Sequence, residues 1–313
     1  MTENGTLTFV SDGSKTITVT TESGFDINDA TENMNKNAVY AVVAPGTHSF
    51  RIRYWLRNTE DCPSGPIEGT VSKYVTLNCV AGAINDITAN LNPTDYDGDH
   101  YYMWDAKQQY WYGYEWTKKL TEGTGQTTTS LQNPATTFPV RGDQRYYNET
   151  FPGLHISNSA IQDSTKNLPN VNEMTWYAMK GDPRWDGDEL WSTMGHLYKG
   201  GMWFYKKDNI ANYSKTKAYD NANYCKISKE CTNAELETGL PSIAKAKQYF
   251  FLPALGNYLS GRLNAIAYYG FYWSSSGNPE DNGYGAYALY FNSTKAFIKI
   301  ASRGYGYRVH KFE

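Results

Sequence analysis

Short segments in which apolar and polar side chains alternate constrain the fold of this chain more than any other feature. The side chains of Phe50, Ile52 and Tyr54 alternate with those of Arg51 and Arg53. A period of two places successive side chains on opposite faces of an extended chain, so this segment is predicted to be a β-strand with one buried face. Comparable segments bounded by turn-forming residues recur along the chain, which indicates a fold rich in β-strands.

The first 92 residues are predicted to form an all-β sandwich domain. The segments "GTLTFV" (5–10) and "KTITVT" (15–20) flank the turn "SDGS", which is a typical hairpin pattern. Further strands are expected within residues 39–56, 70–80 and 82–91. Six or more strands with little helix in about 90 residues are typical of a β-sandwich.

The composition changes after residue 92, where we place a domain boundary. Residues 93–133 are predicted to be a connecting segment, densely aromatic at first and polar afterwards. Residues 134–313 are predicted to form an α+β domain. Helices expected over 170–181 and 232–249 precede the strand-like segments "FYWSSS", "AYALYF", "AFIKIAS" and "GYGYRVHKF".

Charge and hydropathy exclude two classes of partner. The formal net charge is −3, so the chain lacks the basic footprint that nucleic acids attract. No segment approaches the roughly 20 apolar residues that a helical membrane span requires. The N-terminus has neither the basic nor the apolar region of a secretory signal. The chain is therefore either cytosolic or preceded by a signal that has been removed.

We predict no catalytic residue, no metal ion and no cofactor. The five histidines are scattered and belong to no known zinc or nucleophile motif. Asp95, Asp97 and Asp99 alternate as at the start of a calcium loop, but Ala106 occupies the position of the bidentate glutamate. The acidic residues between 182 and 189 are expected to begin a solvated helix.

The four cysteines, Cys62, Cys79, Cys225 and Cys231, allow three complete pairings and form no CxxC motif. Cys225 and Cys231 are close enough in sequence to close one loop. Cys62 and Cys79 are equally compatible with free thiols.

Alternation in the last strands separates a core face from an outward face. The core face is predicted to hold Tyr287, Leu289, Phe291, Ala296, Ile298 and Ile300. Tyr290, Phe297 and Lys299 then point outward. Outward aromatic side chains contribute little to stability and much to binding, so replacing Tyr284, Tyr290 and Phe297 by alanine is expected to remove binding with little change in melting temperature.

Six blocks in the last 150 residues resemble a known family. The blocks are "LPNVNEMTWYAMKGDPRWD", "GGMWFYKK", "YFFLPALGNYLSG", "GFYWSSS", "AYALYFNS" and "YGYRVHKFE". They resemble the Fibrobacter-succinogenes-type major paralogous domain, which is similar to the C-type-lectin fold of formylglycine-generating enzymes and of the variable proteins of diversity-generating retroelements. Residues 1–92 resemble the sandwich of Bacteroidetes fimbrillin-like proteins.

The resemblance implies an all-β sandwich followed by an α+β C-type-lectin-like domain that binds ligands without calcium. It implies a secreted or outer-surface protein, an adhesin or fimbria-associated protein, whose partners are glycans or surface proteins of the host or of neighbouring bacteria, or pilus subunits. Retroelement variable proteins diversify such binding faces. The implied ligand-binding residues are Tyr268, Tyr269, Asn282, Tyr284, Tyr290, Phe297, Lys299 and Tyr305.

Two alternatives remain open. A structural subunit of a surface fibre would bury its tyrosines against neighbouring subunits. A formylglycine-generating oxidase would need a late pair of cysteines, and no cysteine follows Cys231. We therefore expect a binding protein rather than an enzyme.

Overall fold

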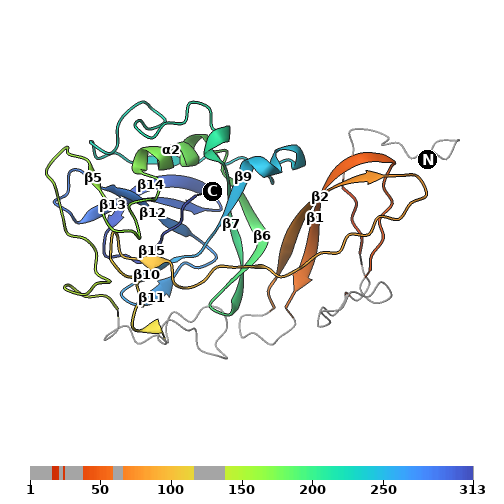
Figure 1. Ribbon diagram of the computed structural model, residues 1–313, viewed down its shortest axis with the longest axis horizontal. Coiled ribbons are helices and arrows are strands. Elements are labelled where there is room, and N and C mark those ends of the chain that lie inside the picture. The colour runs from red at the N-terminus through yellow and green to blue at the C-terminus, as the bar shows by residue number, and fades with distance from the viewer. Residues whose placement is uncertain (1–15, 21–23, 25–37, 59–65, 116–137, 313) are drawn as a thin grey trace. The chain divides into compact units, whose positions relative to one another are not determined.

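The computed structural model describes residues 16–20, 24, 38–58, 66–115 and 138–312 (Figure 1). The chain forms two compact units. The first comprises Met1–Arg53 and Ser72–Leu91, and the second comprises Tyr54–Val71 and Asn92–Glu313.

A long hairpin is the main element of the first ninety residues that the structure describes. Strand β1 (Gly46–Arg57) pairs with β2 (Glu68–Cys79), as the alternation predicts. Cross-strand hydrogen bonds join Thr47 to Asn78 and Ser49 to Thr76, the latter with 2.8 Å between hydroxyl oxygens.

The strand expected over residues 82–91 is absent, and this prediction is wrong. Ile84 and Ile87 lie three positions apart and are exposed, so they cannot share one face of a strand. Residues 16–20 and 38–45 are also outside any strand, whereas the expected strand 5–10 lies outside the described residues. The complete sandwich stays a prediction.

An antiparallel meander forms the centre of the second unit. Strands β12 (Gly270–Gly277), β13 (Gly285–Asn292) and β14 (Lys295–Ser302) pair in sequence order, and β15 (Tyr307–Arg308) lies parallel to β12. These four strands confirm the strand predictions for the C-terminal part. Three short strands complete the sheet: β4 (Tyr101–Tyr102), β5 (Asn158–Ser159) and β8 (Cys231–Asn233).

A second sheet is built on the hairpin of β6 (Arg184–Thr193) and β7 (His196–Tyr205). Met194 and Gly195 have φ values of 50° and 80°, and this left-handed pair is the geometry that a two-residue hairpin turn needs. β9 (Tyr249–Pro253) pairs with β7, and β3 (Thr94–Asp95) runs parallel to β6. β10 (Asn257–Leu259) and β11 (Arg262–Asn264) form a separate small hairpin.

The acidic residues after position 182 form a bulge in β6 rather than a helix start. The pairing register with β7 shifts between Asp186 and Leu190. One carboxylate oxygen of Asp186 accepts hydrogen bonds from the backbone amides of Asp188 and Glu189, at 3.2 and 3.3 Å. The Asp186 side chain thus accepts hydrogen bonds from backbone amides that the bulge leaves unpaired with the neighbouring strand.

One of the two expected helices is present. Helix α2 spans Val171–Lys180 and is capped by Asn170 and Gly181, and Asn170 and Glu173 form a reciprocal capping box. The segment 232–249 instead contributes to β8 and to the 3-10 helix η4 (Ile243–Gln248). Gly239 has a left-handed φ of 75°, and Pro241 lacks the amide hydrogen that a helix would use. A further 3-10 turn, η3, spans Lys207–Asn209.

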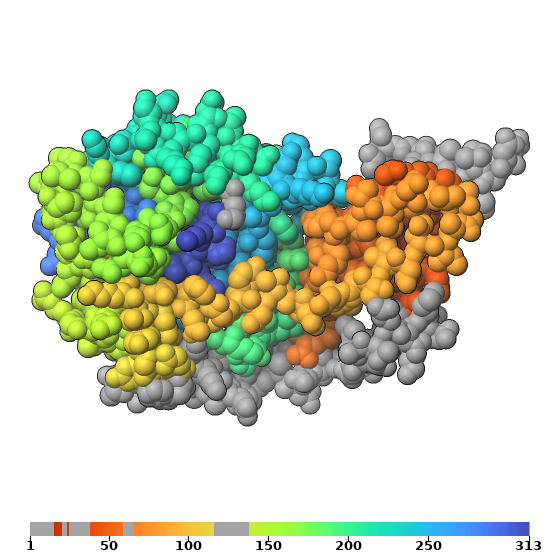
Figure 2. All heavy atoms as spheres, viewed as in Figure 1, coloured from red at the N-terminus to blue at the C-terminus, as the bar shows by residue number. Residues whose placement is uncertain are grey.

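The expected α+β C-type-lectin-like domain is therefore a wrong prediction. The described part of the second unit contains many strands in mixed parallel and antiparallel sheets and a single α-helix. Figure 2 shows the segment that follows residue 92, in amber, running along the surface of this unit.

Two hydrophobic clusters cover the two faces of the meander. The face packed against α2 holds Tyr287, Leu289, Phe291, Ala296, Ile298 and Ile300, as the alternation predicts. The opposite face is also covered. There Trp273, Trp104 and Tyr307 form a second hydrophobic cluster with Ala286, Ala288 and Ala301. Both faces of the sheet therefore contribute to the core.

Candidate functional site

A connected row of aromatic rings lies on the face of the meander opposite α2. We call this row the aromatic strip; it consists of Tyr269, Phe271, Tyr290, Phe297, Tyr305 and Tyr307. The Phe271 ring stacks on Tyr307 with 5.1 Å between centroids and is T-shaped with Tyr290, with 5.0 Å between centroids. Tyr290 in turn stacks on Phe297 at 5.1 Å. Tyr269 and Tyr305 extend the row, with centroids 5.5 Å from Phe271 and 5.7 Å from Tyr307.

Small residues beneath the strip explain why large rings fit there. Ala288 is the cross-strand partner of Trp273, and its methyl group leaves room for the indole. The Trp273 indole stacks on Tyr307 at 4.4 Å, and its Nε1 donates to the carbonyl oxygen of Tyr102 at 2.8 Å. Trp273 is fully buried, so it anchors the strip rather than contacting solvent.

Hydroxyl groups and ammonium groups supply the polar chemistry of the strip. The hydroxyls of Tyr290 and Tyr307 lie 2.8 Å apart. Burial raises the pKa of Tyr290 to about 12 and also raises the pKa of Tyr307, so both hydroxyls stay neutral donors. The Lys295 ammonium lies 4.9 Å from the centre of the Phe297 ring. Lys299, opposite Ala288, is exposed on the same face.

This arrangement suits a ligand with an apolar face and polar substituents. Ring faces stack on the C–H faces of sugars or on apolar side chains, and tyrosine hydroxyls and lysines bind oxygen acceptors. The rings are held by one another, so little side-chain entropy would be lost on binding.

The structure brings together four of the eight predicted binding residues: Tyr269, Tyr290, Phe297 and Tyr305. Their exposure differs from the expectation, because Tyr290 is half-buried and Phe297 is only 7% exposed. The expectation that Phe297 is a freely exposed aromatic is wrong. The alternation predicts the correct face of the strand for Phe297, but the Tyr290 ring and the Lys295 side chain shield the Phe297 ring from solvent.

Three predicted residues lie away from the strip. Tyr284 is 68% exposed and follows Asn282 in the turn before β13. Tyr290 lies six residues further along the chain, which is roughly 20 Å along a strand. Tyr268 is 73% exposed in the turn before β12, and no ring contact joins it to the strip within the described residues.

Sequence reasoning missed Phe271, Tyr307 and Lys295. Phe271 could have been predicted, because it alternates with the buried Tyr272 and therefore lies on the opposite face of the strand. Tyr307 could not have been predicted from the sequence, because its contact with Phe271 depends on the parallel pairing of β15 with β12.

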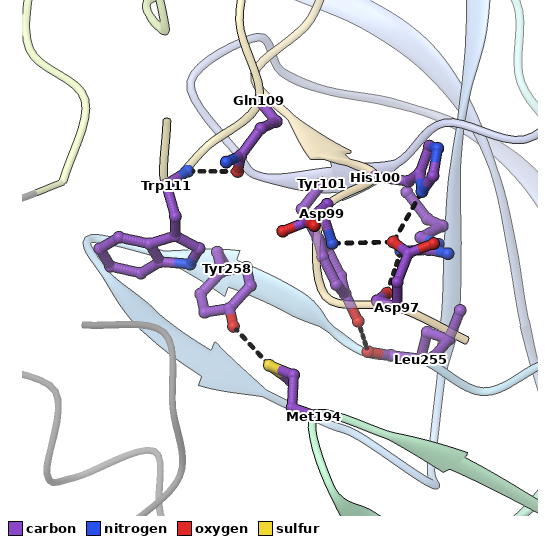
Figure 3. Close-up of polar contacts among 10 residues, drawn as sticks. Asp97, Asp99, His100, Tyr101, Gln109, Trp111, Met194, Leu255 and Tyr258 are labelled. Atoms are coloured by element: carbon purple, nitrogen blue, oxygen red, sulfur yellow. Dashed lines mark hydrogen bonds and ion pairs between the residues drawn. The ribbon is translucent and has the colours of Figure 1, made fainter. Parts of the chain in front are cut away.

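The aspartates near residue 97 anchor a turn instead of forming a calcium loop (Figure 3). Asp97 Oδ1 accepts hydrogen bonds from the Asp99 amide at 2.9 Å and from His100 Nδ1 at 2.7 Å. Arg308 Nη1 donates to the carbonyl oxygen of Asp97 at 2.6 Å. Partial burial acts to raise the pKa of Asp97, but these hydrogen bonds and the Arg308 charge lower it overall.

Asp95 points elsewhere, because its carboxylate accepts a hydrogen bond from the Ser192 hydroxyl at 2.6 Å. In the part of the chain that the structure describes, no group of three or more His, Cys, Asp or Glu side chains is arranged to hold a metal ion.

The cysteine thiols are free where the structure describes them. Cys225 and Cys231 form no disulfide, and Cys79 is free as well, whereas Cys62 lies outside the described residues. Burial raises the pKa of Cys225, and it raises that of Cys231 to about 12. Both groups are therefore thiols rather than nucleophilic thiolates at neutral pH.

Among the described residues, no helix has the length and apolar character that crossing a membrane requires. No protein-family model, no curated protein and no solved structure matches this chain.

Proposed function

We propose that the chain is a binding protein of a cell surface or fimbria, an adhesin, that recognises its ligand through the aromatic strip without calcium. One observation carries the proposal: residues from β12, β13, β14 and the segment around β15 converge in a single row of rings with partly exposed members. Phe297 and Tyr307 are buried, but Tyr269, Phe271, Tyr290 and Tyr305 stay partly exposed, so a ligand can reach four of the six rings.

The chemistry of the strip favours glycans or surface proteins as ligands. Half-buried tyrosines combine a rigid apolar face with a polar tip, which is the composition that recognition surfaces of antibodies also use. Lys299 adds a positive charge beside the strip. The expected location, secreted or on the outer cell surface, rests on the resemblance of the sequence blocks to surface proteins.

The first test is to screen the full chain against a glycan array and a panel of host and bacterial surface proteins, with calcium and with chelator. Tyr305→Ala removes a half-exposed ring of the strip, and Tyr284→Ala is the matched control because its exposed ring lies outside the strip. We expect binding that survives chelation, persists in the control and falls by about tenfold or more with Tyr305→Ala. Equal binding by both variants would contradict the proposal.

A structural role in a fibre is the second candidate, and exposed aliphatic residues of the first unit favour it. Val42, Val80 and Ile84 are all well exposed there, and burying such side chains against another chain would stabilise an assembly. Sedimentation across a range of concentrations tests this role. Association that Ile84→Ser abolishes would support assembly, whereas a monomer at every concentration would speak against it.

A further inference from the structure

We propose that a cleft beside α2 is a second binding site, separate from the aromatic strip, and that it takes an acidic monosaccharide. The cleft has a volume of about 420 Å³, within the range of roughly 300–1,000 Å³ that small-molecule sites occupy. It is lined by Trp176, Lys180, Ala211, Asn212, Tyr219 and Asn221. None of these residues belongs to the strip.

Hydrogen bonds between α2 and the loop that follows β7 fix the walls of the cleft. This loop is the teal segment at the top of Figure 1. Trp176 Nε1 donates to the carbonyl oxygen of Lys217 at 2.8 Å. The amide of Tyr219 donates to Thr175 Oγ1 at 3.2 Å. The site is therefore formed before a ligand arrives, which lowers the entropy cost of binding.

Two asparagines supply the hydrogen-bonding groups. Asn212 and Asn221 have φ values of 63° and 66°, and asparagine tolerates this left-handed conformation better than most residues with a side chain. Both residues are exposed at the cleft. An amide side chain donates and accepts at once, as a sugar hydroxyl does, so a pair of amides matches a polyhydroxylated ligand.

The remaining lining side chains define the rest of the ligand. The partly exposed ring of Tyr219 offers apolar surface for the C–H face of a pyranose, and Trp176, which is only 7% exposed, contributes to the lining mainly from the core. Lys180 is exposed, and it is the charged residue of the lining. The nearby Asp220 carboxylate already binds Lys229 Nζ at 2.6 Å and the Tyr224 hydroxyl at 3.0 Å. The cleft thus presents a positive charge, which favours a sugar that carries a carboxylate.

The proposal is tested by titration calorimetry of the full chain with N-acetylneuraminic acid and glucuronic acid, with galactose as the neutral comparison. We expect the acids to bind and to lose affinity by roughly tenfold in Lys180→Gln, the loss expected for one charge-assisted hydrogen bond. Lys226→Gln, an exposed lysine outside the lining, is the matched control and should bind like the parent chain.

The double substitution Asn212→Gly and Asn221→Gly removes both amides and keeps a backbone that can adopt positive φ without strain. We expect it to bind neither acid. Absence of binding by the parent chain, or unchanged binding by Lys180→Gln, overturns the proposal. Tyr305→Ala should bind the acids normally, so failure of the cleft and failure of the strip give different results.

Discussion

At the scale of single residues, Phe297 and Lys299 occupy the same face of β14 two positions apart and have different environments. Phe297 is covered by the Tyr290 ring and the Lys295 side chain, whereas Lys299 is exposed beside Ala288. The free energy of unfolding should therefore depend strongly on Phe297 and hardly at all on Lys299.

Phe297→Ala is expected to lower the free energy of unfolding by about 3 kcal/mol, because it removes a buried ring and leaves a cavity against Tyr290. Lys299→Ala is the control and should change it by less than about 0.5 kcal/mol. Urea unfolding of both variants measures the difference. A small effect of Phe297→Ala would mean that the ring contributes to the surface only.

Arg303 is a second residue whose role is structural. Its guanidinium lies 4.2 Å from the Trp104 ring centre and donates to the carbonyl oxygens of Gly285, Asn148 and Thr150. Burial lowers its pKa to about 10, which still leaves it charged at neutral pH.

Arg303→Lys should destabilise the protein by about 3 kcal/mol, because a single ammonium group cannot reach three carbonyl oxygens in the planar geometry of a guanidinium. The exposed Arg262→Lys is the matched control. Thermal unfolding compares the two, and equal melting temperatures would refute the assignment.

At the scale of elements, α2 depends on its first turn. Asn170 Oδ1 accepts from the Glu173 amide at 3.1 Å, and the Asn170 amide donates to Glu173 Oε2 at 2.9 Å. This reciprocal pair satisfies donors that a helix end leaves free.

Asn170→Ala should therefore cost about 1 kcal/mol of stability. Asn170→Asp keeps an acceptor for the Glu173 amide and should recover most of the loss. Asn170 Nδ2 also donates to the Lys215 carbonyl oxygen at 3.0 Å. Chemical denaturation of the two variants shows whether the capping hydrogen bond or this second contact stabilises the protein more. If the aspartate variant is as unstable as the alanine variant, the Lys215 contact is the more important one.

Elements with local signals could be predicted from the sequence. The strands of the meander follow from alternation, and α2 follows from the asparagine and glycine at its ends. The helix expected over 232–249 failed because Gly239 and Pro241 outweigh the helix-forming residues around them. The strip could be predicted only in part, because the contact of Phe271 with Tyr307 joins residues that no local pattern links.

At the scale of the whole molecule, tyrosine is by far the most frequent aromatic residue, with 27 residues in 313. Many of the rings are buried in both clusters of the second unit. Burial raises the pKa of Tyr96, Tyr110, Tyr287 and Tyr290 from 10.0 to about 12. The folded chain therefore retains these phenolic protons at pH values where the unfolded chain releases them.

This difference predicts alkaline destabilisation. The contribution of these tyrosines is fully present below pH 10 and is lost as the pH rises through about 12. Urea midpoints should be nearly constant from neutral pH to pH 9 and then fall. Tyrosinate absorbance should rise in two steps, the second coinciding with loss of circular dichroism. A single step near pH 10 in a chain that stays folded would contradict the assignment of these rings to the core.

The contact of Tyr290 with Phe297 and Phe271 has a consequence for how this protein can change over evolution. Any substitution that alters the shape of one ring also removes support from its neighbours, so a new specificity would require compensating changes on adjacent strands. Exposed positions such as Lys299 are free of this constraint. Variation selected for new ligands should therefore accumulate around the row of rings, while the rings themselves change rarely and in pairs.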